Sequence, residues 1–174
     1  MKIDIEGIKI FKSNIYKDKR GFFKEAYKKK ELKKHRELIF HCTSSSQKNV
    51  LRGLHIQTKN PQAKFLTIIK GKIFDVLVDL RKNSKTFGKY FSIILSNNSY
   101  SSIYIPEGFA HGFCALSKEN IIYYMNSNYR EKNYEIGILW NDKNLKIKWP
   151  VKKPILSKKD SKNISFEEYC DKYN

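Results

Sequence analysis

The sequence contains few cysteines, and the three that occur, Cys42, Cys114 and Cys170, are far apart with no Cys-x-x-Cys spacing. An odd number of separated cysteines argues against a disulfide framework and against a cysteine-based zinc site. We therefore expect reduced, partly buried thiols.

The sequence also lacks long apolar segments. No run of about 18 apolar residues occurs, so no membrane-spanning helix is predicted. The N-terminal MKIDIEGIKIF alternates charged and apolar residues and has no continuous apolar stretch of the kind found in signal peptides. We expect a cytoplasmic protein without a membrane partner. Because neither an internal repeat nor a low-complexity linker is present, residues 1–174 are predicted to form one domain.

Acidic residues and arginines are scarce. The chain has 17 Asp and Glu against 35 Lys and Arg, which gives a formal net charge of +18. Such a charge suggests a nucleic acid or an anionic substrate as partner. Only five basic residues are arginines, however, and the lysines are scattered, which favours solvated surface lysines over a nucleic-acid surface. The rare arginines are more informative, since a guanidinium matches the geometry of phosphate and carboxylate groups.

Short segments rich in Ile, Val, Phe and Tyr occupy the middle of the chain, separated by polar, Gly or Asn-rich breaks. This pattern predicts a mainly β protein, a sandwich or barrel. The expected β regions are 43–57, 64–81, 89–96, 101–116, 120–129 and 135–142. Helical signals are weak and peripheral. Residues 24–38 could form a short surface helix with a thin apolar stripe, and 165–174 begins with a serine suited to starting a helix.

Two segments stand out, because in each a histidine follows a glycine within an apolar strand-like run. They are Arg52-Gly53-Leu54-His55-Ile56-Gln57 and Pro106-Glu107-Gly108-Phe109-Ala110-His111-Gly112-Phe113. Alternate strand residues point into a barrel, so both histidines could face one cavity. Either histidine alone would more readily be a core residue, but the pair favours a shared site.

These segments, with several others in order, resemble the dTDP-4-dehydrorhamnose 3,5-epimerase family of the cupin superfamily. The resemblance runs from about Ile10 to Asp160. Its markers are DKRGFFKE from Asp18, NVLRGLHIQ from Asn49, Gln62-Ala63-Lys64, Gly71 through VDLR at Arg81, Thr86-Phe87-Gly88, Ile105 through PEGFAHGF at Phe113, Tyr129, GILWND from Gly137 and LSKKD ending at Asp160. It implies a cupin-type jelly-roll barrel or sandwich with short peripheral helices.

The resemblance also implies an activity and its residues. A member of this family inverts carbons C3 and C5 of a nucleotide-linked 4-keto-6-deoxy sugar, because the ketone acidifies both neighbouring C–H bonds. His55 would be the base, Asp160 its partner, Lys64 the enolate stabiliser and Tyr129 the acid on the opposite face. The residues expected to bind substrate are Arg20, Phe23, Glu25, Arg52, His111, Tyr134, Glu135 and Lys159, with Phe23 and Tyr134 stacking on the nucleobase.

No cofactor is expected. Metal-binding cupins use a His-x-His pair with further ligands, whereas here His55-Ile56-Gln57 supplies one histidine. His55 and His111 alone are fewer than the three or four protein ligands that zinc or iron sites require. By resemblance, the protein is expected to be a homodimer in which strands cross between subunits.

One segment departs from the family pattern. Where the family has Gln-x-Asn-x-Ser, this chain has Phe40-His41-Cys42-Thr43-Ser44, so two amides that help hold the nucleotide are replaced by poorly bonding groups. The nucleotide could then be dTDP or GDP, the sugar a hexose or a heptose such as a GDP-linked 4-keto-6-deoxy-heptose, and inversion could be limited to C3. A capsule or O-antigen pathway would suit each case.

Two other functions compete with epimerisation. The first is a sugar-nucleotide 3,4-ketoisomerase of the same superfamily, which the set of His55, Lys64, Tyr129 and Asp160 disfavours. The second is a non-catalytic polyanion-binding module that uses the net charge of +18 and would bind nucleic acid in a salt-sensitive way.

Overall fold

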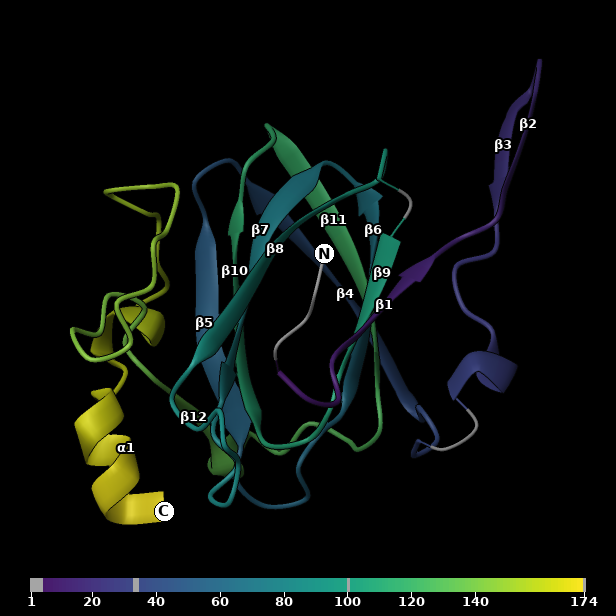
Figure 1. Cartoon of the computed structure of the whole chain (residues 1–174). Helices are drawn as coiled ribbons and strands as arrows, with labels where there is room; N and C mark the ends of the chain where they lie inside the picture. The colour runs from purple at the N-terminus through teal and green to yellow at the C-terminus, as the bar shows by residue number, and fades with distance from the viewer. Residues whose placement is uncertain (1–4, 33–34, 100, 174) are drawn as a thin grey trace.

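The computed structural model describes residues 5–32, 35–99 and 101–173, and its strands form two five-stranded antiparallel sheets that pack face to face (Figure 1). The first sheet has the order β1 (Lys9–Lys12), β9 (Ser101–Ile105), β6 (Lys64–Lys70), β11 (Glu119–Asn126) and β4 (Phe40–Gln47). The second has the order β12 (Glu135–Gly137), β5 (Leu51–Gln57), β10 (Phe109–Ala115), β7 (Lys72–Asp79) and β8 (Tyr90–Ser96). The mainly β prediction is confirmed.

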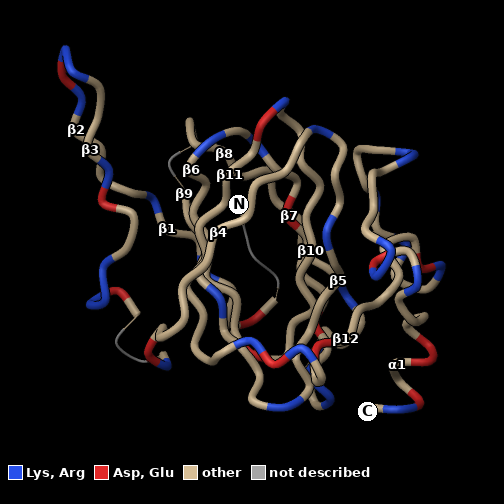
Figure 2. The backbone as a smooth tube through the Cα atoms, turned by 180° about the vertical axis from the view of Figure 1, so that it is seen from behind, with Lys and Arg blue, Asp and Glu red and all other residues tan. Residues whose placement is uncertain are grey.

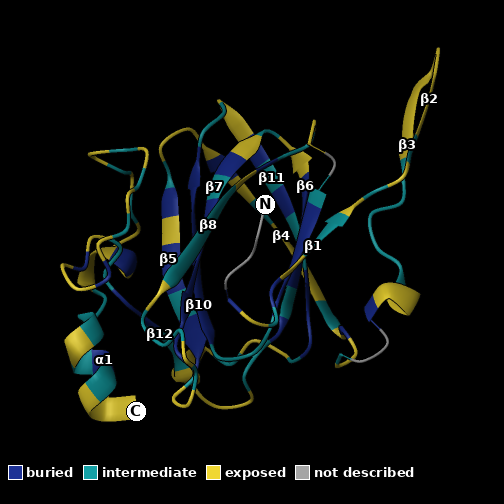
Figure 3. Cartoon of the chain, in the orientation of Figure 1, coloured by how far each residue is buried: buried dark blue, intermediate teal, exposed yellow. Residues whose placement is uncertain are grey.

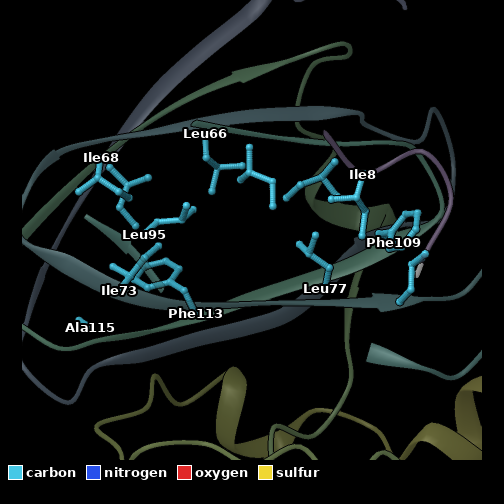
Figure 4. Close-up of a cluster of buried hydrophobic side chains, with 13 residues drawn as sticks. Ile8, Leu66, Ile68, Ile73, Leu77, Leu95, Phe109, Phe113 and Ala115 are labelled. Atoms are coloured by element: carbon cyan, nitrogen blue, oxygen red, sulfur yellow. The ribbon is translucent and has the colours of Figure 1, made fainter. Parts of the chain in front are cut away.

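The main core fills one part of the space between the sheets (Figure 4). Its buried side chains come from both sheets, as Leu66 and Ile68 of β6 and Ile73 and Leu77 of β7 illustrate. Figure 3 shows the buried residues concentrated on these central strands. Aliphatic burial of this kind stabilises the sandwich by removing apolar surface from water.

A second apolar cluster lies on the other side of β7. Because strand side chains alternate, Val76 and Val78 face away from Leu77 and pack with the C-terminal segment, including Leu145 and Tyr169. Covering on both faces explains why β7 has buried apolar side chains on both of its sides. The segment contains the short 3-10 helix η3 (Asp160–Lys162) and ends in helix α1 (Phe166–Tyr173). Ser165 Oγ accepts from the backbone N–H of Glu168 at 3.0 Å, which confirms the predicted helix start.

The hairpin of β2 (Ile15–Asp18) and β3 (Gly21–Lys24) projects from the sandwich (Figure 1). Its two strands pair with each other and with no other strand of the described chain. The side chains of Tyr16, Phe22 and Phe23 are 59%, 59% and 66% exposed. Aromatic side chains of this size seldom stay in water on a projecting arm unless another surface covers them.

The prediction of a surface helix over residues 24–38 is wrong. Residue 24 ends β3, and the helical part is one 3-10 turn, η1 (Lys29–Leu32). Leu32 and Leu38 are buried, but Ala26 is only partly so. The apolar stripe is too thin to hold a longer helix, and the predicted range includes residues 33–34, which lie outside the described part. The other short helix is η2 (Lys132–Tyr134).

Lys and Arg are spread over the hairpin, the loops at both ends of the sheets and the C-terminal segment (Figure 2). This distribution agrees with solvated surface lysines. Of the helices in the described residues, none has the length and apolar character needed to cross a bilayer.

Candidate active site

A cavity of about 350 Å³ opens between the two sheets, in the size range of small-ligand sites. Six strands contribute to its wall, β4, β5, β6, β10, β11 and β12, together with the loop before η3. His55 and His111 both line it, and their Cα atoms are paired across β5 and β10. The prediction that the two histidines share one cavity is therefore confirmed.

His55 is held by a carboxylate that is 105 residues away in sequence. Its Nε2 lies 2.5 Å from Asp160 Oδ1, and the Asp160 side chain is 5% exposed. Burial acts to raise the pKa of Asp160, but the His55 hydrogen bond and charge outweigh it and leave the pKa below its usual value. An ionised carboxylate accepts the Nε2–H, which leaves Nδ1 of a neutral ring with its lone pair. The ring is thus arranged to accept a proton at Nδ1.

His111 has a partner of the same kind. Its Nε2 lies 2.7 Å from Asp75 Oδ1 on the neighbouring β7, and both side chains are buried. The remaining oxygen, Asp75 Oδ2, has no hydrogen-bond partner among the described residues. The carboxylate therefore acts on His111 alone, and it fixes the orientation of that ring in the cavity wall.

Glycines allow the two histidine strands to approach closely. Gly53 has a φ of +108°, and a Cβ there would lie 2.5 Å from both Gly112 Cα and His111 O. Only glycine fits this backbone conformation and this spacing. Gly53 and Gly112 therefore serve the contact between β5 and β10, which sets His55 opposite His111.

Lys64 and Tyr124 line the same cavity. Burial lowers the pKa of Lys64, and no hydrogen bond or ion pair to its ammonium is found in the described chain. Burial also raises the pKa of Tyr124, whose hydroxyl lies 3.2 Å from Ser44 Oγ. The site thus holds an amine with no hydrogen-bonded partner in the described chain, near the charge of Glu135, and a phenol that stays protonated. Such groups can stabilise and reprotonate an enolate.

Arg52, Glu135 and Lys159 also line the cavity, as predicted. Arg52 donates from Nε to Ser46 Oγ and from Nη2 to Ser45 O, each at 3.1 Å. Glu135 accepts from Lys159 and from Arg130, a cavity residue that the sequence did not single out. Burial acts to raise the pKa of Glu135, but the two cations and the charge of His55 hold it at about 2.

The departure from the family pattern lies in this wall. Phe40, Cys42 and Ser44 of β4 line the cavity. Asn126 of β11 donates from Nδ2 to Phe40 O at 3.1 Å and lies 3.8 Å from Cys42 Sγ. An aromatic ring and a thiol therefore line the cavity at the two positions where the resemblance led us to expect amides.

Tyr129, which the resemblance suggested as the acid, does not line the cavity. Its side chain is 66% exposed, and it is not part of the cavity wall. Its ring packs 6.0 Å from the ring of Phe40, on the outside. Tyr124, five residues earlier, lines the cavity. Strand alternation offered the signal, because Tyr124 and Asn126 lie on one side of β11 and both face the cavity.

Four further candidates also lie outside the cavity of their own chain. Arg20 and Phe23 lie on the projecting hairpin, and Arg20 is paired with Asp18. Glu25 follows the hairpin and pairs with Lys28. The remaining candidate, Tyr134, packs under the ammonium of Lys59 at 4.8 Å. Nucleobase stacking by Phe23 or Tyr134 is therefore not supported within one chain.

Across the described ranges, no three His, Cys, Asp or Glu side chains are grouped as metal ligands. Each cavity histidine instead has one carboxylate partner, a geometry that orients imidazoles for acid–base work.

Comparison with known proteins decides the family. The model of the dTDP-4-dehydrorhamnose 3,5-epimerase family matches residues 2–168. The chain belongs to the dTDP-4-dehydrorhamnose 3,5-epimerase family. Among curated relatives, the enzyme of that name from Shigella flexneri is 42% identical over 171 residues, covering 95% of this chain and 94% of the relative.

Solved structures agree. The dTDP-6-deoxy-D-glucose-3,5-epimerase from Legionella pneumophila, in complex with dTDP-4-keto-L-rhamnose, superimposes with a TM-score of 0.91 at 36% identity, covering 95% of this chain and 90% of that one. The dTDP-4-dehydrorhamnose 3,5-epimerase from Bacillus anthracis, with TDP and PPi bound, gives 0.91 at 37% identity, covering 95% and 98%.

The cupin-like epimerase fold and the sugar-nucleotide epimerase class are thereby confirmed, and neither competing function is better supported. Both solved relatives contain thymidine nucleotides, so the expectation of a GDP-linked heptose gains no support.

Proposed function

We propose that this epimerase inverts C3, C5 or both in a dTDP-linked 4-keto-6-deoxy sugar. The observation that carries the proposal is the hydrogen-bonded His55–Asp160 couple at the wall of a cavity that also contains Lys64 and Tyr124. The ligands of the solved relatives support the thymidine nucleotide.

In the proposed reaction, His55 Nδ1 removes the proton from a carbon next to the C4 ketone. Asp160 stabilises the imidazolium that forms, because its depressed pKa keeps it ionised. The electrons move onto the ketone oxygen, and the Lys64 ammonium stabilises that enolate. No cofactor enters these steps.

Reprotonation from the opposite face completes the inversion. We assign this step to Tyr124 in place of Tyr129, because Tyr124 lies in the cavity and its raised pKa keeps the phenol protonated until an enolate carbon approaches. His111, held by Asp75, would contact the sugar. Arg52 would meet the diphosphate, since no carboxylate neutralises it in the described chain.

Solvent exchange tests the function. In deuterated water, dTDP-4-keto-6-deoxyglucose should gain deuterium at C3, C5 or both, as NMR would detect. His55→Ala should slow exchange by about 100-fold or more, the usual contribution of a general base. Absence of exchange with both dTDP- and GDP-linked 4-keto sugars would refute the catalytic proposal, and full-rate exchange by His55→Ala would refute the base.

The same panel resolves the substrate. Phe40 and Cys42 line the wall where amides were expected, so the identity of the nucleotide and the identity of the sugar must each be tested. We expect the dTDP-linked hexose to react faster than GDP-linked hexose or heptose. The positions that exchange would report whether C3 alone is inverted. A role in surface-polysaccharide synthesis follows if the product is a deoxy-sugar donor.

We also propose that the chain acts as one domain over residues 1–174, in the cytoplasm, as a homodimer. The support for the dimer is the projecting hairpin with its exposed aromatic side chains. A two-stranded hairpin is marginal alone and gains stability when its apolar side is covered. Light scattering on the purified protein should give about twice the mass of 20.6 kDa.

A further inference from the structure

Two connecting segments cross between the sheets next to the proposed catalytic groups. Residues 58–63 join β5 of the second sheet to β6 of the first, and residues 127–134 join β11 of the first sheet to β12 of the second. His55 lies three residues before the first segment, Lys64 directly follows it, and Tyr124 lies three residues before the second. The base is therefore on one sheet, and the enolate stabiliser and the acid are on the other.

Gln57, the last residue of β5, joins the two connecting segments through its side-chain amide. Its Nε2 donates to Asn60 O in the first segment at 2.7 Å and to Tyr129 O in the second at 3.2 Å. Its Oε1 accepts from the backbone N–H of Glu131, also in the second segment, at 2.8 Å. Gln57 is 6% exposed. Because both N–H donors and the oxygen of this buried amide have partners, the amide is held in one orientation.

Further hydrogen bonds join the same segments at their other ends. Gln62 Nε2 donates to Asn128 O at 2.8 Å, and Asn128 Nδ2 donates to Pro61 O at 2.7 Å. The backbone N–H of Ala63 donates to Ser127 Oγ at 2.9 Å, and that of Ser127 donates to Ala63 O at 3.0 Å. The two segments therefore form one crosslinked unit, which we call the loop clamp (residues 57–63 and 127–134).

The loop clamp lies where apolar packing between the sheets is interrupted by the cavity. In the main core, side chains from both sheets meet and fix the spacing of the sheets. At the clamp, the space between the sheets is the cavity itself, so packing supplies less of this constraint. The hydrogen bonds of the clamp must then hold the strands that carry the catalytic groups at the right separation.

A second buried amide shows what a purely structural role looks like. Asn120, at the start of β11, donates from Nδ2 to Ser46 O at 3.0 Å and to Ser117 O at 2.8 Å. Its Oδ1 accepts from the backbone N–H of Lys72 at 3.0 Å. It is 0% exposed and does not line the cavity. Asn120 therefore makes the same kind of contacts as Gln57, but it makes them away from the catalytic groups.

We propose that Gln57 is a positioning residue for epimerisation, and that its amide sets the separation between His55 on the second sheet and Lys64 on the first. The inference rests on the proposed function, and Gln57 itself lies outside the cavity wall. A reacting group displaced by about 1 Å can slow a reaction by about 100-fold, so loss of the clamp should act on the chemical step. The nucleotide dTDP has no reacting carbon, so its binding should depend little on this separation.

Gln57→Glu tests the proposal by replacing the donor Nε2 with an oxygen, which keeps the shape of the side chain and the acceptor for Glu131. We expect kcat for dTDP-4-keto-6-deoxyglucose, followed by NMR, to fall by about 10- to 100-fold. In titration calorimetry, the Kd for dTDP should change by less than about threefold, because no ligand contact is removed. This division between kcat and Kd is not expected of a residue that serves folding alone.

Asn120→Asp is the matched control, because it too replaces a buried amide donor that serves two backbone carbonyls. It should lower the melting temperature and leave kcat within about threefold of the wild type. Asn128→Asp guards against a folding defect in Gln57→Glu, since Asn128 is only partly buried. Removing its bond to Pro61 should lower kcat by about 3- to 10-fold, again with little change in dTDP binding.

Wild-type kcat in folded Gln57→Glu, or in Asn128→Asp if Gln57→Glu does not fold, would overturn the positioning role. An equal loss of kcat and of dTDP affinity would also overturn it, because the clamp would then serve ligand binding. A matching fall of kcat in Asn120→Asp would assign the effect to general loosening of the fold. Proton exchange by the wild type is measured separately, so failure of the epimerase proposal is distinguishable from failure of the clamp.

Discussion

Tyr124 and Tyr129 form a matched pair for mutagenesis, because Tyr124 lines the cavity and Tyr129 lies outside it. We expect Tyr124→Phe to lower the epimerisation rate by about 100-fold or more, as loss of a general acid does. Tyr129→Phe should change it by less than about threefold, because a surface substitution away from the site costs little. Steady-state NMR assays of both variants decide this. The reverse ranking would return the role to Tyr129.

Proton exchange of the substrate in the Tyr124→Phe variant gives a second check. The base His55 is intact in that variant, so solvent deuterium should still enter the substrate while the inverted product is lost. Exchange that disappears together with inversion would mean that Tyr124 positions the substrate and does not deliver the proton.

The lowered pKa of Lys64 predicts a pH dependence. The charged ammonium stabilises the enolate, so activity should fall as pH rises through that pKa, below the ordinary lysine value. Stability should change in the opposite direction over the same window. The unfolded chain binds the extra proton there, so the free energy of unfolding rises with pH. Rate–pH profiles and urea titrations measure the two trends.

A variant that cannot titrate identifies the group. Lys64→Arg should be slower but should lose the alkaline fall in rate, because guanidinium stays charged. Lys72→Arg is the control, since Lys72 is exposed at the start of β7. An alkaline fall at the same pH in Lys64→Arg would assign it to another residue.

Residue positions were predictable where a motif supplied them. His55, His111, Lys64 and the distant Asp160 meet in the cavity as expected. Tyr129 was misplaced because, among 11 tyrosines, sequence resemblance alone located it. Arg130 was missed because its significance lies in a contact with Glu135 that only the folded chain creates.

Gly53 allows the paired strands β5 and β10 to approach closely. A Cβ on Gly53 would clash with backbone atoms of β10, and its φ is +108°. We expect Gly53→Ala to lower the free energy of unfolding by about 2 kcal/mol or more, since strain and overpacking add. Gly21→Ala is the matched control, because its φ is +134° but nothing lies within 4 Å. It should cost about 1 kcal/mol. Equal losses in urea unfolding would mean that the strand contact imposes no steric requirement.

Element types were easier to predict than element ends. Alternating apolar residues predicted the β regions because the sandwich buries one or both faces of each strand. Residues 24–38 misled because their thin apolar stripe suggested a helix, whereas only Lys29–Leu32 form a 3-10 turn, which buries Leu32, and Leu38 is buried from outside that turn. The paired arm over 15–24 carries exposed aromatics, which no core pattern could reveal.

For the whole molecule, the hairpin leaves a discrepancy to explain. Arg20 and Phe23 were expected to bind the substrate, but both lie on the hairpin, outside the cavity of the same chain. A homodimer resolves the discrepancy if each arm reaches the cavity of the other subunit. The isologous geometry of a two-fold dimer would then complete both sites at once.

Mixing two inactive variants tests this exchange of arms. Arg20→Ala leaves His55 intact, and His55→Ala leaves the arm intact. After co-refolding in equal amounts, each mixed dimer should contain one complete site, so activity should return to about a quarter of the wild-type value. Either variant refolded alone should stay inactive, which is the control. No recovery in mixed dimers whose formation is confirmed by differently tagged subunits would show that Arg20 acts within its own chain. Full activity of Arg20→Ala alone would show that the arm is not used.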